Sequence, residues 1–257
     1  YIIKNQIMHL KYKIVFGLTL IFSTAFAQKT IHGQAVWVAY LGQYKFTEKF
    51  GTHIEVQWRG DANFEQNRQN LFRIGGMYYL NNKISLSAGY GLIKTYKQSL
   101  NDFFTENRTW EQIQYNHNWF ENKNVMSHRF RLEQRFVDNI VLNSDDEVIV
   151  EATNYQNRLR YLNRNLFHLF KFNNDRNKAY AILQDEFFFN LGDNKVNANF
   201  FDQNRFLLGF GINYENTIRL EVGYLNHLVT PSTGNNIMNH NVSMSIIHNL
   251  DYTNSKK

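Results

Sequence analysis

The chain has 257 residues with one proline and no cysteine, and it carries 28 basic and 22 acidic side chains. The lack of cysteine excludes disulfides and thiolate metal sites, and no stretch beyond the N-terminus approaches the roughly 20 apolar residues of a membrane helix. Aromatic residues are abundant, with 22 Phe, 15 Tyr and 4 Trp beside many Asn, Gln and Arg. That mixture favours a barrel with lipid outside and water inside.

The N-terminus has the pattern of a cleaved signal peptide, which we expect to span residues 1–27. Met8 is its predicted start, so residues 1–7 lie upstream of the translated chain. A lysine-containing stretch precedes about a dozen apolar residues and a small-x-small site that ends at Ala27. Cleavage removes three lysines and no acid, so the 25 basic and 22 acidic residues of the mature chain give a net charge of +3. A charge this small gives no argument for a nucleic-acid partner. Residues 28–257 then form one exported domain.

Apolar and polar side chains alternate along most of the mature chain with a period of two. Leu86, Ala88 and Tyr90, for example, alternate with serine and glycine. A helix would spread such residues around its circumference, whereas a strand places them on one face. We count eleven such segments, at residues 33–41, 52–60, 70–80, 83–95, 108–119, 126–137, 155–170, 178–189, 202–214, 217–227 and 238–250. Bacterial single-chain barrels have even strand numbers, so twelve strands are expected.

The connections between these segments alternate in length. Asn81-Asn82-Lys83 and Glu215-Asn216 are tight turns of residues that tolerate a left-handed backbone. The other connections are longer and polar, at residues 61–69, 97–107, 138–154, 190–201 and 228–236. The sequence therefore predicts an all-β fold, a single antiparallel up-and-down transmembrane barrel of 10 to 12 strands with short periplasmic turns and longer extracellular loops.

The apolar side of each strand should face lipid in such a barrel. We expect six residues of two adjacent segments on the outer surface: Phe206, Leu208, Phe210, Ile212, Val222 and Tyr224. Aromatic residues near strand ends are interpreted as interfacial girdles: Trp37, Trp58, Trp110, Trp119, Tyr40, Tyr78, Tyr79 and Tyr96. A soluble secreted β-barrel binding protein, the remaining alternative for the fold, would turn the aromatic side inward.

The polar side of each strand should face the lumen, because an arginine at mid-depth against lipid costs about 2–4 kcal/mol. The predicted lumen-lining charge network consists of Glu55, Arg59, Arg73, Arg129, Arg131, Glu133, Arg135, Arg158, Arg160, Glu186, Arg205, Arg219 and Glu221. One interpretation is an Arg–Glu–Gln lattice that fills a narrow lumen. The other is a basic wall that selects anions in an open pore. A barrel of twelve strands lies between filled and open sizes, so both interpretations stand.

Several segments resemble one family of predicted Gram-negative outer-membrane barrels, domain of unknown function 2490. The segments that carry this resemblance are His128–Phe136, Arg158–Tyr161, Asp185–Phe188, Phe201–Arg205 with Gly209 and Gly211, and Gly223–Leu225. The resemblance spans most of the mature chain. It implies an outer-membrane barrel, and because the family has no established activity it implies no catalytic residue.

Enzymatic chemistry has weaker support in the sequence. Some outer-membrane barrels hydrolyse lipids with a serine and a histidine, and the candidate pairs are His240 with Ser243, Ser127 with His128, and His248 with Ser245. None has a recognisable third member, and there is no G-x-S-x-G motif. Asp185 and Glu186 should point to opposite faces of a strand. We therefore predict no catalytic residue.

An acidic stretch in the longest predicted loop, containing Asp145, Asp146, Glu147 and Glu151, lacks the ligand spacing of a calcium loop and is interpreted as solvated. We predict no metal and no cofactor.

These observations predict an outer-membrane protein that is structural or forms a narrow pore for small polar or anionic solutes. The alternatives are an outer-membrane lipid-modifying hydrolase and the soluble binding protein. Expected partners are outer-membrane lipid and lipopolysaccharide, together with the barrel-assembly machinery during biogenesis. No nucleic-acid partner is expected, and the sequence leaves the oligomeric state open.

Overall fold

The computed structural model describes residues 29–120, 124–174 and 176–253, so the predicted signal peptide lies outside the described residues. No helix in these ranges is long and apolar enough to cross a membrane. The described residues form eleven strands and one short 3-10 turn. In chain order these are β1 (Thr30–Lys45), β2 (Phe50–Asp61), β3 (Asn67–Tyr79), β4 (Ile84–Lys97), η1 (Gln98–Leu100), β5 (Asp102–Trp119), β6 (Asn124–Leu142), β7 (Val148–Phe172), β8 (Asn177–Leu191), β9 (Phe201–Tyr214), β10 (Ile218–Val229) and β11 (Asn236–Asp251).

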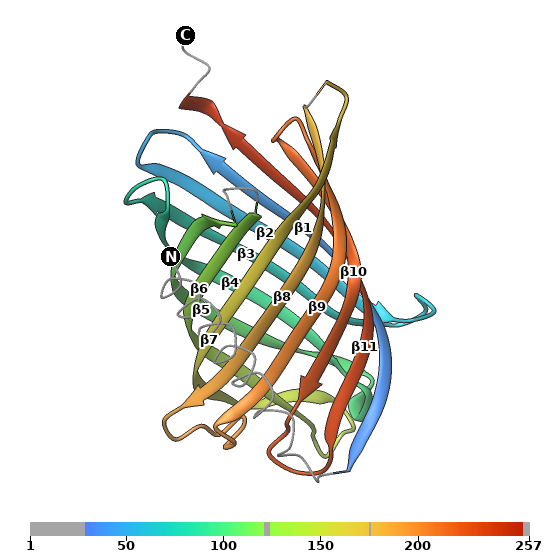
Figure 1. Ribbon diagram of the computed structural model, residues 1–257. Helices are drawn as coiled ribbons and strands as arrows, with labels where there is room; N and C mark the ends of the chain where they lie inside the picture. Colours follow the sequence, from blue (N-terminus) through green and yellow to red (C-terminus); the bar gives the residue numbers. More distant parts are fainter. Residues whose placement is uncertain (1–28, 121–123, 175, 254–257) are drawn as a thin grey trace, which may run out of the picture. The chain divides into compact units, whose positions relative to one another are not determined.

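The strands form one closed barrel in which each pairs antiparallel with the next (Figure 1). The barrel closes where β1 lies beside β11. Because ten antiparallel steps separate β1 from β11, these two strands run in the same direction. Contacts across this seam agree, since the bonded pairs His32–His240 and Tyr40–His248 are both 208 residues apart. A constant offset is the mark of a parallel pair.

Parallel closure explains why the described residues hold eleven strands and not the twelve that the even-number rule predicted. The rule applies to barrels in which every neighbouring pair is antiparallel. One parallel seam removes that requirement, as in the 19-stranded mitochondrial channel. The fold class itself, an all-β up-and-down barrel, is confirmed.

The two ends of the barrel differ in their connections. We call the "turn end" the one that carries residues 46–49, 80–83 and 215–217, and the "loop end" the one that carries residues 62–66, 98–101, 143–147, 192–200 and 230–235. At the turn end, Asn81, Glu215 and Asn216 occur in tight turns, and the last two have the left-handed backbone expected of them. The longest connection, residues 192–200, belongs to the loop end.

Two of the predicted loops are mostly strand. β6 extends to Leu142 and β7 begins at Val148, so the predicted loop at residues 138–154 is the end of a long hairpin. β4 and β5 likewise shorten the loop predicted at residues 97–107. The period of two is lost in the β6–β7 extension, where apolar residues follow one another on both strands and only Ile140 among them is buried. Ladder hydrogen bonds hold this extension.

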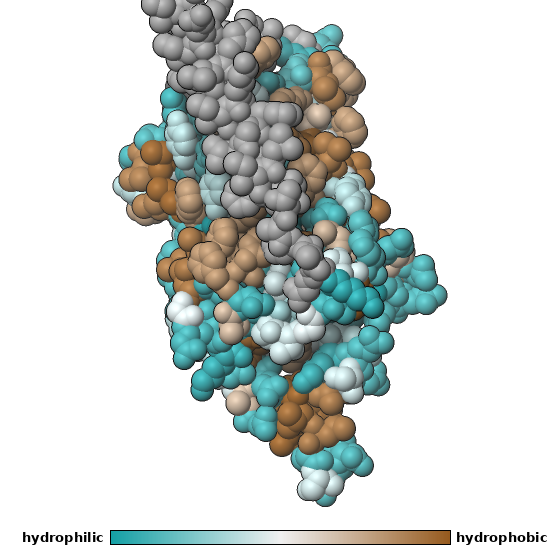
Figure 2. All heavy atoms as spheres, turned by 60° about the horizontal axis from the view of Figure 1, so that its bottom comes forward, coloured by the Kyte–Doolittle hydropathy of each residue, from teal (hydrophilic) through white to brown (hydrophobic). Residues whose placement is uncertain are grey.

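The outward face of the barrel is apolar. All six residues predicted to face lipid are exposed, from Phe206 at 37% to Phe210 at 63% of their surface. Figure 2 shows patches of apolar side chains over the barrel wall and hydrophilic side chains gathered toward the loop end. The interior, in contrast, buries the charged residues described below. This arrangement contradicts the soluble alternative, which required the aromatic side to face inward.

The parallel seam can be tested by cysteine cross-linking, because the chain has no cysteine of its own. The pair His32→Cys with His240→Cys should form a disulfide in the folded barrel on mild oxidation, since the two native rings stack at 5.2 Å. The matched pair His32→Cys with His248→Cys should not, because eight residues along a strand span about 26 Å. Cross-linking of only the second pair would contradict the parallel register of β1 and β11.

Candidate functional site: the lumenal charge lattice

Glu133 of β6 lies at the centre of the barrel interior and is completely buried. Its carboxylate accepts hydrogen bonds from Arg158 (2.7 and 3.1 Å) and Arg160 (2.7 Å), both on β7. Arg108 of β5 donates a further bond at 3.2 Å. Arg73 of β3 and Arg131 of β6 place guanidinium nitrogens at 3.8 and 4.0 Å. Five guanidinium groups from four strands therefore surround one carboxylate, and β3 reaches β6 only through the lumen.

The arginines around Glu133 carry the lattice toward β2 and β8. Arg73 also pairs with the buried carboxylate of Glu55, to which His53 lies at 3.4 Å. Arg160 also donates to Glu186 through Nε at 3.0 Å and Nη2 at 2.7 Å. Glu186 accepts a second arginine, because Arg129 donates to it at 2.6 Å. Each carboxylate in this direction is thus bridged to Glu133 by one shared guanidinium.

A second branch runs toward the loop end. The Nε of Arg108 donates to Glu106 at 2.7 Å, and Arg135 holds the same carboxylate with two bonds of 2.7 and 2.8 Å. Arg158 donates to Asp202 of β9 at 3.0 Å. Bidentate and shared guanidinium contacts of this kind are the strong class of side-chain hydrogen bond. They tie β5, β6, β7 and β9 together through the interior.

Aromatic rings fill the space between the guanidinium groups. Trp110 is 1% exposed, with the guanidinium of Arg131 4.9 Å from its ring centre. Its indole lies where Gly75 and Gly89 leave room, since a Cβ on either glycine would come within 2.8 Å of the ring. Phe188 is fully buried, and the guanidinium carbons of three arginines lie near its ring centre. These are Arg158 at 5.2 Å, Arg160 at 4.4 Å and Arg205 at 4.5 Å.

The girdle prediction was wrong for three of its eight residues. Trp110 belongs to the lattice, and Trp37 and Tyr79 line the lumenal cavity described below. The reason is parity, because each of these residues lies on the same side of its strand as lumenal neighbours such as Gln112 and Ala39. Position near a strand end does not decide which face a side chain takes.

Asparagines hold the long connection to neighbouring residues at the loop end. Asn197 is buried and donates to the carboxylate of Asp202 at 2.9 Å and to the carbonyl of Thr230 at 2.8 Å. Asn190 donates to the carbonyls of residues 197 and 199 at 3.2 and 2.8 Å. We call residues 192–200 the plug segment. Through Asp202 its hydrogen bonds continue directly into the Arg–Glu lattice.

A cavity of about 630 Å³ lies in the lumen. Its lining includes the lattice residues Glu55, Arg131 and Glu186 and extends to the exposed Asn216 and Asp251 at the turn end. Glu106, Glu133, Arg158, Asp202 and the plug segment contribute nothing to its wall. We call the exposed turn-end side of this lining the mouth of the cavity, and the side away from the mouth its floor. The whole space is called the lumenal cavity.

The thirteen residues of the predicted charge network divide into two groups. Seven are buried in the lattice: Glu55, Arg73, Arg131, Glu133, Arg158, Arg160 and Glu186. Six are partly exposed: Arg59, Arg129, Arg135, Arg205, Arg219 and Glu221. Of these six, Arg135 belongs to the branch toward the loop end, and the other five line the lumenal cavity.

Sequence reasoning missed several members of the network. Glu106 and Arg108 precede Trp110 at steps of two residues on β5, and Arg164 follows Arg160 in the same way on β7. Arg164 donates two hydrogen bonds of 2.6 Å to the carboxylate of Glu221. Glu221 is therefore paired with an arginine that the predicted network did not contain. Arg108 and Arg164 lie inside the predicted segments, so the period of two applied along each whole segment, and extended by two residues to Glu106, would have found all three. The partner of each arginine could not have been found, because it depends on contacts across the lumen.

The wall of the barrel separates each candidate serine–histidine pair. Ser127, Ser243 and Ser245 line the lumenal cavity. His128 and His240 instead contact the outward tyrosines, Tyr161 and Tyr224. The members of each pair are an odd number of residues apart, and such residues point to opposite sides of a strand. The described residues also contain no group of three or more His, Asp or Glu side chains that could hold a metal ion.

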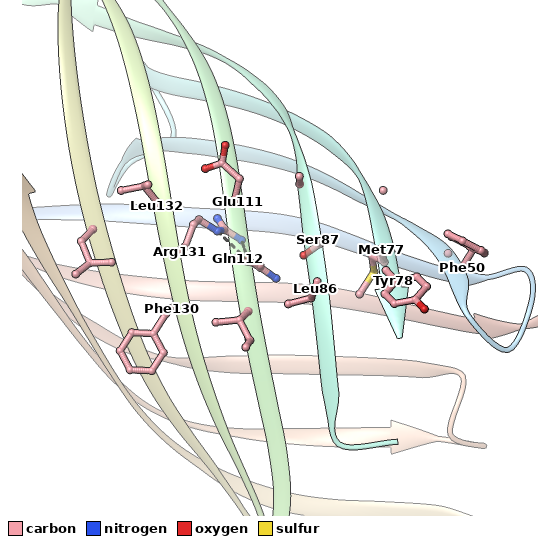
Figure 3. A pocket seen from close by; sticks show the side chains of 15 residues that line it. Phe50, Met77, Tyr78, Leu86, Ser87, Glu111, Gln112, Phe130, Arg131 and Leu132 are labelled. Atoms are coloured by element: carbon pink, nitrogen blue, oxygen red, sulfur yellow. Dashed lines mark hydrogen bonds between the residues drawn. The ribbon is translucent and has the colours of Figure 1, made fainter. Parts of the chain in front are cut away.

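A second, shallower cavity of about 730 Å³ lies at the barrel wall between β2 and β6. Figure 3 shows its labelled residues, where Arg131 donates to Gln112 on the lumenal side while Glu111 points the other way. Outward residues such as Leu86, Phe130 and Leu132 make most of the lining apolar. Glu111 is an exception to the apolar outer face, and its carboxylate accepts a bond from Gln134 at 3.1 Å.

The geometry defines a β-barrel of the outer-membrane type, apolar outside and charged inside. The family model described as a protein of unknown function, DUF2490, matches residues 34–238. The chain therefore belongs to this family, and the resemblance found in the sequence is confirmed.

Two solved structures resemble the chain at low similarity. The NanC porin is 9% identical with a TM-score of 0.43, and the match covers 75% of this chain and 86% of that one. The β domain of the Bordetella autotransporter BrkA is 7% identical with a TM-score of 0.44, covering 76% of this chain and 82% of that one. No curated protein matches the chain.

Removal of the central carboxylate should destabilise the barrel strongly. The variant Glu133→Gln keeps the side-chain shape but leaves five guanidinium groups without their shared anion. Breaking a buried ion pair costs about 3–5 kcal/mol, which urea unfolding in lipid vesicles would measure. The matched control is Glu111→Gln on the outer wall, which should lose far less. Equal stability of both variants would contradict the central role of Glu133.

Proposed function

We propose that this protein is an integral outer-membrane barrel whose lumen is closed, and that it acts as a structural or solute-binding protein and not as an open pore. One observation carries the proposal, namely that the outer wall is apolar while the lumen holds a charge lattice. Lipid is the solvent that suits such a wall. By the rule that short turns are periplasmic, the turn end and the mouth of the lumenal cavity face the periplasm.

Closure of the lumen is supported by two barriers in series. The lattice around Glu133 joins β3 to β7 across the interior, and the plug segment joins Asp202 to the carbonyl of Thr230. A solute that entered from the turn end would meet both. Surrounding outer-membrane lipid, lipopolysaccharide and the barrel-assembly machinery are the partners proposed with this role.

A second candidate is a narrow anion pore that opens when the plug segment leaves. The observation in its favour is the charge of the lumenal cavity, whose lining contains nine lysine and arginine side chains against four carboxylates. Basic walls of this kind select anions in pores. An open pore would require the hydrogen bonds of Asn197 to break and the lattice around Glu133 to separate. The closed barrel requires no rearrangement.

Fractionation tests the membrane location. The full-length protein, expressed in a Gram-negative host, should appear in outer membranes that resist alkaline extraction, with a mature N-terminus at Gln28. Retention of Met8, or recovery of folded protein from the soluble periplasm, would refute this part of the proposal.

Planar-bilayer recording tests closure. Folded wild-type protein should insert without steady conductance if the lattice closes the lumen as proposed. A variant with residues 193–199 replaced by a glycine–serine segment of equal length lacks the asparagine hydrogen bonds and distinguishes the two barriers. If this variant still shows no conductance, the lattice alone is sufficient for closure. If it conducts, the plug segment is the gate. A steadily conducting wild-type barrel would overturn the closed form in favour of the pore.

A further inference from the structure

We propose that the floor of the lumenal cavity is a binding site for a small oxyanion, a carboxylate or a phosphate group, held between Arg59 and Arg205 beside Trp37. The inference rests on the proposed function in one respect, since it adds a ligand class to the cavity of that barrel. Its chemistry derives from the side chains that surround one ring.

Trp37 of β1 holds two guanidinium groups close together. The guanidinium carbon of Arg59, on β2, lies 3.9 Å from the centre of the indole ring, and that of Arg205, on β9, lies 4.9 Å from it. His227 of β10 packs its ring edge-on against the same indole at 5.2 Å. Side chains from four strands therefore meet at one place, and the two arginines line the cavity.

Neither arginine has a carboxylate partner among the described residues. Arg59 donates only to the amide oxygens of Gln57 and Gln69. Arg205 donates one bond, from Nη2 to Gln203 at 3.1 Å, and its buried Nε has no acceptor. In the lattice just below, arginines such as Arg158 and Arg160 each contact two carboxylates. The pair beside Trp37 is thus the part of the floor where positive charge is not balanced.

An oxyanion satisfies this arrangement in three ways. It relieves the repulsion between two like charges in a partly desolvated space. It offers an acceptor to the orphan Nε and to guanidinium edges, which match carboxylate and phosphate oxygens in pairs. Packing against the indole restricts both guanidinium groups, which lowers the side-chain entropy lost on binding. The cavity volume of about 630 Å³ admits a small solute beyond the anionic group itself.

Isothermal titration of the folded, mature full-length barrel in neutral detergent provides the test. Inorganic phosphate and acetate serve as probes at constant ionic strength against chloride. The wild type should bind at least one of them saturably with a stoichiometry of one. Arg59→Gln and Arg205→Gln should each weaken that binding roughly tenfold or more, the loss expected for a charged hydrogen-bonding partner.

Two controls separate a built site from diffuse attraction. Arg68→Gln removes the same charge at an exposed position of β3, and it should leave the affinity unchanged. Arg219→Gln removes a charge that also lines the cavity but does not contact Trp37, and its effect should stay within about twofold, as expected for long-range electrostatics. If Arg219→Gln weakens binding as much as Arg59→Gln, attraction is diffuse and the site is wrong.

Tryptophan fluorescence gives an independent readout. Anion binding should change the emission of the wild type, and Trp37→Phe should lose that change. Retention of the full change in Trp37→Phe, or no saturable binding of either anion by folded wild type, overturns the proposal. Neither result bears on closure, because bilayer conductance is measured without the anion and tests the barriers alone. Folding of each variant is checked by its heat-modifiable migration on gels.

Discussion

The structure depends on one constraint, that charges buried in the lattice around Glu133 must be neutralised by each other. Glu133 meets it by accepting guanidinium groups from β5 and β7 while Arg73 and Arg131 lie within 4.0 Å. Because side chains alternate across the wall, a slip of one residue in any of these strands would turn an arginine toward lipid and an apolar side chain into the lattice. The lattice therefore fixes register as well as charge. The two glycines beside Trp110 fit the same account, since the indole fills the space that the guanidinium groups leave.

The period of two was sufficient to predict the wall of the barrel. It placed Phe206 and Val222 outside, and it selected Glu133 and Arg160 by their polar side, because lipid and water impose opposite requirements on the two faces. It could not predict the ends of the strands. The hairpin of β6 and β7 continues past the predicted strand ends on backbone pairing and on side-chain bonds such as Thr153 to Asp138, which no alternation of apolar residues predicts. The count of eleven segments agrees with the eleven strands, and only the choice of twelve was wrong, because the direction of the seam between β1 and β11 is set by closure and leaves no pattern in either strand.

Trp37 and Trp110 show where a composition rule misleads. Tryptophan is common at membrane interfaces, yet both rings lie on the lumenal parity of their strands and pack against guanidinium groups. A cation–π contact attracts the guanidinium group of a buried arginine without cancelling its positive charge. Aromatic rings therefore stabilise those arginines of the lumen that have no carboxylate partner. The partner of each arginine was also beyond the sequence, because Arg164 reaches Glu221 from β7 to β10 across the interior and no spacing rule describes such a contact.

One aromatic side chain, Phe188, contacts both the arginines of the lattice and an arginine of the cavity floor that has no carboxylate partner. Phe188 lies under Arg158 and Arg160 of the lattice and also under Arg205 of the cavity floor. Arg158 continues to Asp202, and Asp202 accepts the bond of Asn197 in the plug segment. Only the ring of Phe188 therefore separates Arg205 from Arg158, the arginine that shares Asp202 with the plug segment. The unbalanced charge of Arg205 lies beside the balanced charge of Arg158, and both guanidinium groups share one aromatic neighbour. Cation–π contact lets the two groups approach one ring without a carboxylate between them.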